Sequence, residues 1–222
     1  MTIDVTRIEL DTSNPEPRCP CVLLLDTSQS MSGSPIEEVN AGLREFCRSL
    51  QEDDLAMLRV EVAVVTFGGT PTVVQDFTTA HQFQAPTLRA IGNTPMGAAI
   101  QMALNLLNVR KESYIRNGLS YFRPWVFLVT DGAPTDGDTW RVAAQRVQQA
   151  EDNKKVAFFA VGVGAKADMS VLRQIGRRQP VSLKGLNFKE MFLWLSSSLI
   201  RVSRSKPGDE IPPQRPMEWV NS

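Results

Sequence analysis

The chain has 222 residues, of which 42% are apolar and 22% charged, and its 24 basic side chains balance 24 acidic ones. These proportions suit one globular domain, and the zero net charge argues against a nucleic-acid-binding protein held by excess positive charge. No apolar run approaches the roughly 18 residues of a transmembrane helix, and the polar start of the chain lacks a signal-peptide pattern. We therefore expect a cytoplasmic protein that binds neither nucleic acid nor membrane.

Six segments are predicted to form strands. The first is a continuous apolar run ending in Asp26, typical of a strand buried on both faces of a parallel sheet. The second and third are joined by a short turn at Gly68 and Gly69, which allows only an antiparallel pair. The predicted strands cover residues 21–26, 60–67, 72–77, 125–130, 156–161 and 180–183.

Helical periodicity fills the intervals between these strands. Ser34, Pro35 and Glu37 have the pattern of a capping box at the start of the first helix. Thr94 precedes a proline at the start of the second, and Asp168 is placed to cap a short later one. The predicted helices cover residues 34–50, 94–107, 139–153, a short stretch after 168, and 188–204.

Strands that alternate with helices predict an α/β fold, a doubly wound and mostly parallel sheet with helices on both faces. We assign the domain to residues 18–205, after a polar N-terminal lead at 1–17. The Pro-rich tail at 206–222 has no period. It is either disordered or pinned to the domain by Trp219, and we favour a partly ordered arm.

Oxygen-bearing side chains gather where ligands bind in open α/β sheets, just beyond the carboxyl ends of strands. Asp26, Ser28 and Ser30 alternate after the first strand, so an extended turn can aim three oxygens at one point. Thr94 lies in a loop that enters a helix, and Asp131 follows the fourth strand. Two carboxylates and three hydroxyls, without histidine or thiolate, favour a hard divalent cation such as Mg²⁺, Mn²⁺ or Ca²⁺.

This series of D-x-S-x-S, a Thr in a G-x-T-P loop, and T-D-G resembles the von Willebrand factor A (VWA) domain with its metal-ion-dependent adhesion site (MIDAS). The resemblance covers residues 18–203 and implies a Rossmann-like, six-stranded sheet in the order 3-2-1-4-5-6 with one antiparallel edge strand. It implies that Ser28, Ser30 and Thr94 bind the metal directly, most readily Mg²⁺. Asp26 and Asp131 would act directly or through water, and an acidic group of a partner protein would complete the shell.

The residues around these motifs are similar to the bacterial tellurium-resistance TerY type. That similarity implies a small cytoplasmic stress-response protein whose partner is a kinase or phosphatase of the same system. Our interpretation is a non-enzymatic, metal-dependent interaction module. The alternatives are a metal-dependent phosphohydrolase that uses Asp26, and a scaffold with a purely structural metal site whose tail binds the partner. Against the phosphohydrolase, Ser28 stands where haloacid dehalogenase phosphatases have a second Asp, and no G-x-S-x-G elbow is present.

The zero net charge is unevenly divided along the chain. Residues 1–108 carry 13 acidic and 6 basic side chains, whereas residues 109–222 carry 11 acidic and 18 basic. In the implied sheet order these halves lie on opposite flanks, with the metal site between them. A neutral total can carry a strong dipole, so we expect association with a charged partner to be salt-sensitive.

Other polar residues near these motifs have simpler readings. Asp136 and Asp138 follow the loop that carries Asp131. They are either solvated loop acids or the cap of the next helix, or else they tune the metal affinity or face a basic partner. Cys19 and Cys21 lack the second pair of ligands that a zinc site needs, and the single His81 excludes a multi-histidine site.

Overall fold

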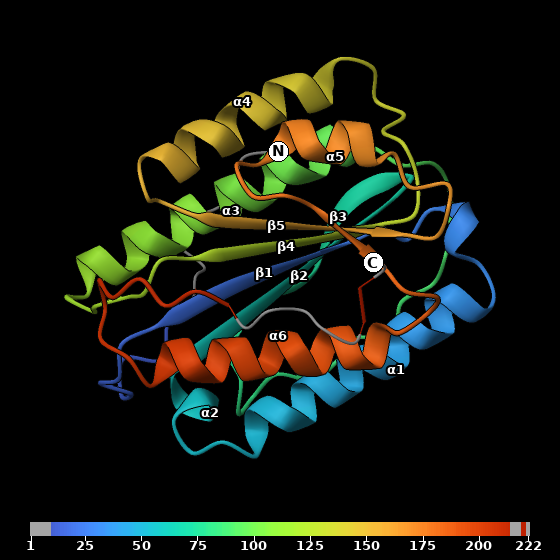
Figure 1. Ribbon diagram of the computed structural model, residues 1–222. Helices are drawn as coiled ribbons and strands as arrows, with labels where there is room; N and C mark the ends of the chain where they lie inside the picture. The colour runs from blue at the N-terminus through green and yellow to red at the C-terminus, as the bar shows by residue number, and fades with distance from the viewer. Residues whose placement is uncertain (1–9, 214–218, 221–222) are drawn as a thin grey trace.

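The computed structural model describes residues 10–213 and 219–220. A single sheet of six strands runs through it, with helices packed on both faces (Figure 1). The strands are β1 (Cys19–Leu25), β2 (Val60–Gly68), β3 (Thr70–Thr79), β4 (Trp125–Thr130), β5 (Ala157–Val163) and β6 (Val181–Leu183). The helices are the 3₁₀ turn η2 (Gln29–Met31), α1 (Ser34–Gln51), α2 (Ala56–Arg59), α3 (Met96–Arg116), α4 (Thr139–Asp152), α5 (Met169–Ile175) and α6 (Phe188–Ser203).

The strand order is β3-β2-β1-β4-β5-β6. Every neighbouring pair is parallel except β2 and β3, which are antiparallel across the short turn at Gly69. The predicted fold class, its strand order and its antiparallel edge strand are therefore confirmed. The strands of the acidic half of the chain lie on one flank of the sheet and those of the basic half on the other.

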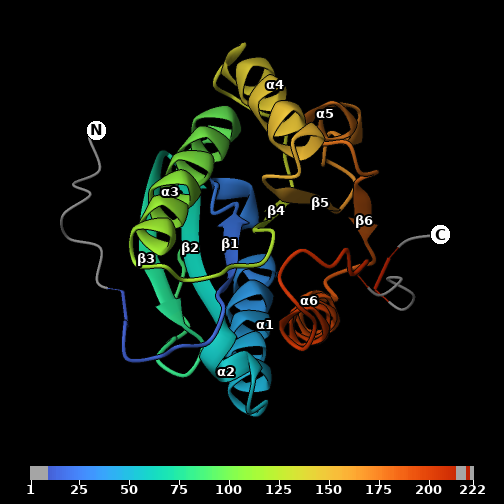
Figure 2. The same ribbon diagram turned by 90° about the vertical axis from the view of Figure 1, so that its left-hand side faces the viewer.

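Both faces of the sheet are buried, and β1 shows why its sequence is apolar without alternation. Cys19, Cys21 and Leu23 point into the core beneath α1 and α6, whereas Val22 and Leu24 point into the core beneath α3, α4 and α5. Figure 2 shows these two helical layers on opposite sides of the strands. A strand enclosed in this way gains from apolar side chains at every position.

The start of α1 differs from the prediction. Gly33 occupies the N-cap with a φ of 79°, and Ser34 is already helical and makes no capping hydrogen bond. The left-handed conformation at Gly33 suits glycine, so the helix begins through backbone geometry rather than through a capping box. The predicted cap of α5 is confirmed, because Asp168 accepts hydrogen bonds from the backbone of Ser170 and Val171.

The described part of the N-terminal lead is fastened to the sheet by Arg18. This fully buried guanidinium donates to the carbonyls of Asp11 and Asn14 at 2.8 Å and lies 3.1 Å from the Glu61 carboxylate. Arg110 contacts the other oxygen of Glu61 at 2.7 Å. The buried Glu61 carboxylate therefore pairs with two guanidinium groups. These ion pairs offset part of the free energy that the charged groups lose on desolvation. The domain limits at 17/18 and 205/206 stay a prediction.

The tail returns to the sheet at Trp219, which agrees with the pinned alternative. Its indole is 3% exposed and meets Trp194 edge-on with ring centroids 5.2 Å apart. Lys184 donates its backbone N–H to the Trp219 carbonyl at 2.8 Å, and Val220 pairs with Leu183 beside β6. Of the helices in the described ranges, none is apolar over a length that would cross a membrane.

Candidate metal centre

Asp26 lies at the carboxyl end of β1, where β1 and β4 are neighbours and the chain leaves the sheet in opposite directions. Its side chain is almost fully buried. One carboxylate oxygen accepts the backbone N–H of Ser28 at 2.8 Å, and the other accepts the hydroxyl of Thr130 at 2.5 Å. These two bonds fix the orientation of the carboxylate at the switch point of the sheet, where ligands bind in this class of fold.

The surroundings of Asp26 act on its ionisation in opposing ways. Burial raises the pKa of Asp26, the hydrogen bonds from Thr130 and Ser28 lower it, and the nearby Asp131 carboxylate raises it further, with a net rise. The negative charge at this position is therefore stabilised less well than in water. A bound cation would supply the missing compensation.

Ser28, Ser30 and Asp131 form a continuous chain of contacts between two loops. The hydroxyl oxygens of Ser28 and Ser30 lie 3.0 Å apart, and Ser30 donates to Asp131 Oδ1 at 2.8 Å. The turn η2 begins directly after Ser28 and brings the two serines to the same side of the loop. Together with the bond from Ser28 to Asp26, these contacts unite four of the five predicted ligands.

Thr94 is the fifth predicted ligand, and Thr135 holds its backbone in place. Its backbone N–H donates to the Thr135 hydroxyl at 3.0 Å, and its carbonyl accepts the Thr135 N–H at 2.9 Å. Its own hydroxyl lies 3.6 Å from the place where a Cβ on Gly132 would stand, beside Asp131. Because α3 starts at Met96 with Pro95 at its cap and no side-chain capping bond, the Thr94 hydroxyl is not used as a helix cap.

Backbone contacts hold the loop after β1 against the loop before α3. Ile91 donates to the carbonyl of Thr27 at 2.7 Å, and Gln29 donates to the carbonyl of Gly92 at 2.8 Å. The turn after β2 presses against both, since a Cβ on Gly68 would lie 2.2 Å from the Thr27 oxygen. Only glycine permits this approach. The loops that carry the predicted ligands are thus preorganised by main-chain packing.

Asp136 takes a position that the sequence did not predict. Its Oδ2 accepts the backbone N–H of Ala98 at 2.8 Å, so it caps the N-terminus of α3 from another loop. Its Oδ1 is buried, and within residues 10–213 and 219–220 it has no hydrogen-bond partner. Asp138 stands at the start of α4, where it forms an exposed ion pair with Arg141.

The structure adds Thr130 to the candidate site, a residue that was not among the predicted ligands. It is fully buried, donates to Asp26 and accepts the N–H of Gly132 at 3.3 Å. The T-D-G motif contained the signal, because a hydroxyl directly before a strand-end aspartate faces the neighbouring strand.

The grouped oxygens define what the site can hold. The site contains two carboxylates. Within the described ranges, no group of three or more His, Cys, Asp or Glu side chains lies close enough together to hold a metal ion. A cation here would depend on the serine and threonine hydroxyls as much as on the carboxylates. Such a donor set suits a hard divalent ion and leaves room for water or an incoming acidic group.

Residues 21–190 match the von Willebrand factor type A domain, so the chain belongs to this family. Domains of this family are generally non-catalytic modules that mediate binding between proteins. The match covers β1 to the start of α6 and includes all three loops of the candidate site.

Two human proteins are related to the chain. Inter-alpha-trypsin inhibitor heavy chain H6 is 27% identical over 159 residues, which are 69% of this chain and 12% of that protein. Heavy chain H4 is 25% identical over 158 residues, which are 69% of this chain and 17% of that protein. The chain therefore spans less than a fifth of the length of these curated relatives.

Several solved structures share the fold. The pilus adhesin SpaC of Lactobacillus rhamnosus GG, in its open conformation, has a TM-score of 0.68 at 16% identity, over 85% of this chain and 31% of that one. A von Willebrand factor type A protein of Catenulispora acidiphila has a TM-score of 0.66 at 16% identity, over 83% and 43%. The manganese-loaded TRAP protein of Plasmodium vivax has a TM-score of 0.57 at 20% identity, over 81% and 73%. At these identities the likeness establishes the fold.

Proposed function

We propose that the chain is a non-enzymatic interaction module that binds an acidic group of a partner protein through a divalent cation. Ser28, Ser30 and Thr94 would hold the ion directly, and Asp26 and Asp131 directly or through water. Mg²⁺ is the ion of choice, with Mn²⁺ and Ca²⁺ as alternatives. The observation that carries the proposal is the unbroken path of hydrogen bonds from Asp26 through Ser28 and Ser30 to Asp131.

The chemistry of the residues supports an open coordination position. Two carboxylates balance a divalent charge, and Mg²⁺ keeps several waters, one of which a partner carboxylate can replace. The protein's own part is to fix the ligands: Thr130 orients Asp26, and the glycine contacts keep the loops in place. The manganese-loaded TRAP protein, which shares this fold, is a VWA protein that holds such an ion.

The burial of Asp26 argues against the phosphohydrolase alternative. A nucleophilic carboxylate needs a free oxygen facing substrate, but both oxygens of Asp26 already accept hydrogen bonds and the side chain is 1% exposed. A buried and oriented Asp26 can still support a bound metal ion, because that role depends on the orientation of its carboxylate more than on access for a substrate.

We further propose a cytoplasmic bacterial stress system of the tellurium-resistance TerY type as the setting. The support is the sequence at the three loops, above all Asp26 to Glu37, which is similar to that type. The partner would then be a kinase or phosphatase of the same system that presents an acidic side chain.

Capture of the partner from a bacterial lysate, with and without EDTA, tests this function. The immobilised full chain should retain the partner in Mg²⁺ and release it in EDTA, and Ser30→Ala should retain none. Asp138→Asn changes an exposed acid outside the site and serves as the matched control. Retention that is equal in EDTA, or equal for Ser30→Ala, would contradict the proposal, and retention lost on deletion of residues 206–222 alone would favour the scaffold alternative.

A further inference from the structure

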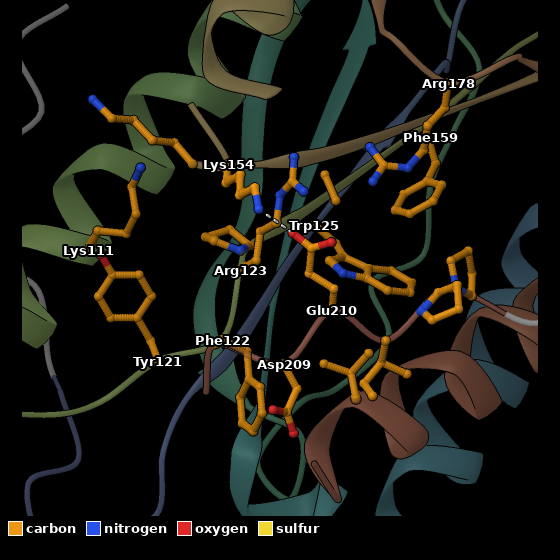
Figure 3. A pocket seen from close by; sticks show the side chains of 18 of the residues that line it. Lys111, Tyr121, Phe122, Arg123, Trp125, Lys154, Phe159, Arg178, Asp209 and Glu210 are labelled. Atoms are coloured by element: carbon orange, nitrogen blue, oxygen red, sulfur yellow. Dashed lines mark ion pairs between the residues drawn. The ribbon is translucent and has the colours of Figure 1, made fainter. Parts of the chain in front are cut away.

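A groove of about 1100 Å³ is lined by residues other than those of the candidate metal centre, and Figure 3 shows it from close by. It is formed by the amino ends of β4 and β5, the second half of α3 and the segment that follows α6. Because the candidate metal centre sits at the carboxyl ends of β1 and β4, the two sites are separated by the length of a strand. The groove plays no part in the function proposed above.

Five basic side chains line this groove, and they come from four separate segments of the basic half of the chain. They are Lys111, Arg123, Lys154, Lys155 and Arg178. The domain itself contributes one acid to the lining, Glu112, within the part of the chain that the structure describes. Arg178 is paired with the buried Glu151, and Lys154 is paired with Glu210 of the tail, so that within the described residues Lys111, Arg123 and Lys155 form no ion pair.

Like charges crowd one another in the groove. Burial and the neighbouring Lys155 lower the pKa of Lys111, and burial and the neighbouring Arg178 lower the pKa of Arg123. Such crowding is relieved when an anion enters. The geometry of the cations thus favours a negatively charged occupant.

The floor of the groove is aromatic. Trp125 and Phe159 pack with ring centroids 4.7 Å apart, and Tyr121 and Phe122 extend the apolar surface. An occupant therefore needs apolar side chains as well as a carboxylate. Aromatic and basic residues in one concave surface are typical of sites that bind peptide segments.

The chain's own tail occupies part of the groove. Glu210 pairs with Lys154 at 2.7 Å, and the charges of Arg123 and Arg178 also act on its carboxylate (Figure 3). The sequence around it is Gly-Asp-Glu-Ile-Pro-Pro, which combines acidic and apolar residues. Both partners of this ion pair are largely exposed, at 74% and 68%, so solvent screens their attraction and the contact is weak.

The backbone at Lys154 is a second and independent observation. With a φ of 54°, Lys154 is the single non-glycine residue in the left-handed region among residues 10–213 and 219–220. It follows the C-terminus of α4, a position where glycine is preferred and a lysine is strained. This strained position carries the ammonium group that pairs with Glu210.

We propose that this groove is a second protein-binding surface, which takes an extended acidic and proline-containing segment of another protein. In the absence of that segment, residues 208–213 of the chain itself occupy part of the groove. The weak Glu210–Lys154 pair is displaced by a segment with more carboxylates, which also reach Lys111, Arg123 and Lys155. Binding at this end of the sheet needs no metal ion.

Fluorescence anisotropy with a labelled peptide tests the proposal on the full chain in EDTA. The probe is Gly-Asp-Glu-Ile-Pro-Pro, compared with Gly-Asn-Gln-Ile-Pro-Pro, which has lost both carboxylates. We expect the acidic probe to bind and the amide probe to bind at least tenfold more weakly. Glu210→Gln removes the anchor of the tail, so the acidic probe should bind that variant about threefold to fivefold more tightly.

Variants of the groove separate recognition from folding. Lys154→Gly should weaken binding of the acidic probe. It should also raise the melting temperature, because glycine adopts the left-handed conformation at this position without strain. Lys155→Glu should weaken binding of the acidic probe further. Lys189→Glu reverses a charge on α6 outside the groove and should leave binding of the probe unchanged. Equal binding of both probes, no response to Glu210→Gln, or binding that requires Mg²⁺ would each overturn the proposal.

Discussion

Thr130 donates its hydroxyl to the buried carboxylate of Asp26 at 2.5 Å, across the boundary between β4 and β1. Neither residue can satisfy its polar atoms in water, because Thr130 is fully buried and Asp26 nearly so. The orientation of a candidate metal ligand thus depends on a residue that would not itself touch the ion. Partners of this kind typically tune metal affinity by roughly tenfold to a hundredfold.

Replacing Thr130 by Val tests this dependence. The variant keeps the shape but leaves one oxygen of Asp26 buried and unpaired, which should destabilise the protein by about 1–3 kcal/mol. Mn²⁺ affinity, measured by calorimetry, should fall about tenfold. Thr130→Ser restores the donor and should recover most of both quantities. Equal Mn²⁺ affinity in the Val and Ser variants would contradict the positioning role.

Asp26→Asn should separate the stability of the metal-free protein from metal binding. Burial and the nearby Asp131 raise the pKa of Asp26, so a neutral amide relieves an unfavourable charge. In EDTA the melting temperature of the variant should stay close to that of the wild type, because relief of the charge offsets the loss of one of the two hydrogen bonds that Asp26 accepts. Added Mg²⁺ should raise the melting temperature of the wild type and not that of the variant, since only a bound ion stabilises the folded state. A Mg²⁺ shift of equal size in both proteins would show that Asp26 holds no ion.

Gly68→Ala tests whether backbone packing positions the loops of the candidate metal centre. The new Cβ would stand 2.2 Å from the Thr27 carbonyl oxygen, so the turn after β2 must move away from the first loop. We expect a loss of more than about 2 kcal/mol in unfolding free energy, measured by urea denaturation, together with weaker metal binding. Gly118→Ala is the control: it has a φ of 67° and open space around it, so it should lose only the roughly 1 kcal/mol of a left-handed alanine and keep its metal affinity.

The Asp168 cap of α5 predicts a pH dependence of stability. Hydrogen bonds from the side chain of Ser170 and the backbone of Val171 hold the pKa of Asp168 below its ordinary value of 3.8. A lowered pKa in the folded state means that the contribution is present above pH 3.8 and fades as the pH falls below it. Asp168→Ala should therefore cost about 1 kcal/mol at pH 7 and progressively less under acid conditions. A difference from wild type that is constant down to pH 2 would contradict the assignment.

Much of the fold follows from sequence patterns because the two helical layers enclose the sheet. Continuous apolar runs such as that before Asp26 are the direct consequence of burial on both faces, so their positions in the chain locate the strands. The grouping of Ser28, Ser30 and Asp131 was predictable for a related reason, since parallel strands deliver their carboxyl ends to one edge of the sheet.

The features that the sequence did not reveal depend on contacts between distant segments. Ser34 reads as a helix cap, yet the chain enters α1 through the positive φ of Gly33. The single turn α2 is too short for a periodic pattern, and Asp53 holds it by accepting N–H bonds from Leu55 and Ala56. The basic residues of the groove come from four segments that are separated in the sequence, so no local sequence motif predicts the groove.

Calorimetric titration of the metal-free full chain with Mn²⁺ is the most direct test of the metal site. Mn²⁺ stands in for Mg²⁺ because it prefers the same oxygen ligands and usually binds more tightly. We expect a single saturable site in the wild type, lost in the Ser28→Ala/Ser30→Ala variant and retained in Asp138→Asn. A wild type that takes up no Mn²⁺, or a double variant that binds it with unchanged affinity, would contradict the proposed centre.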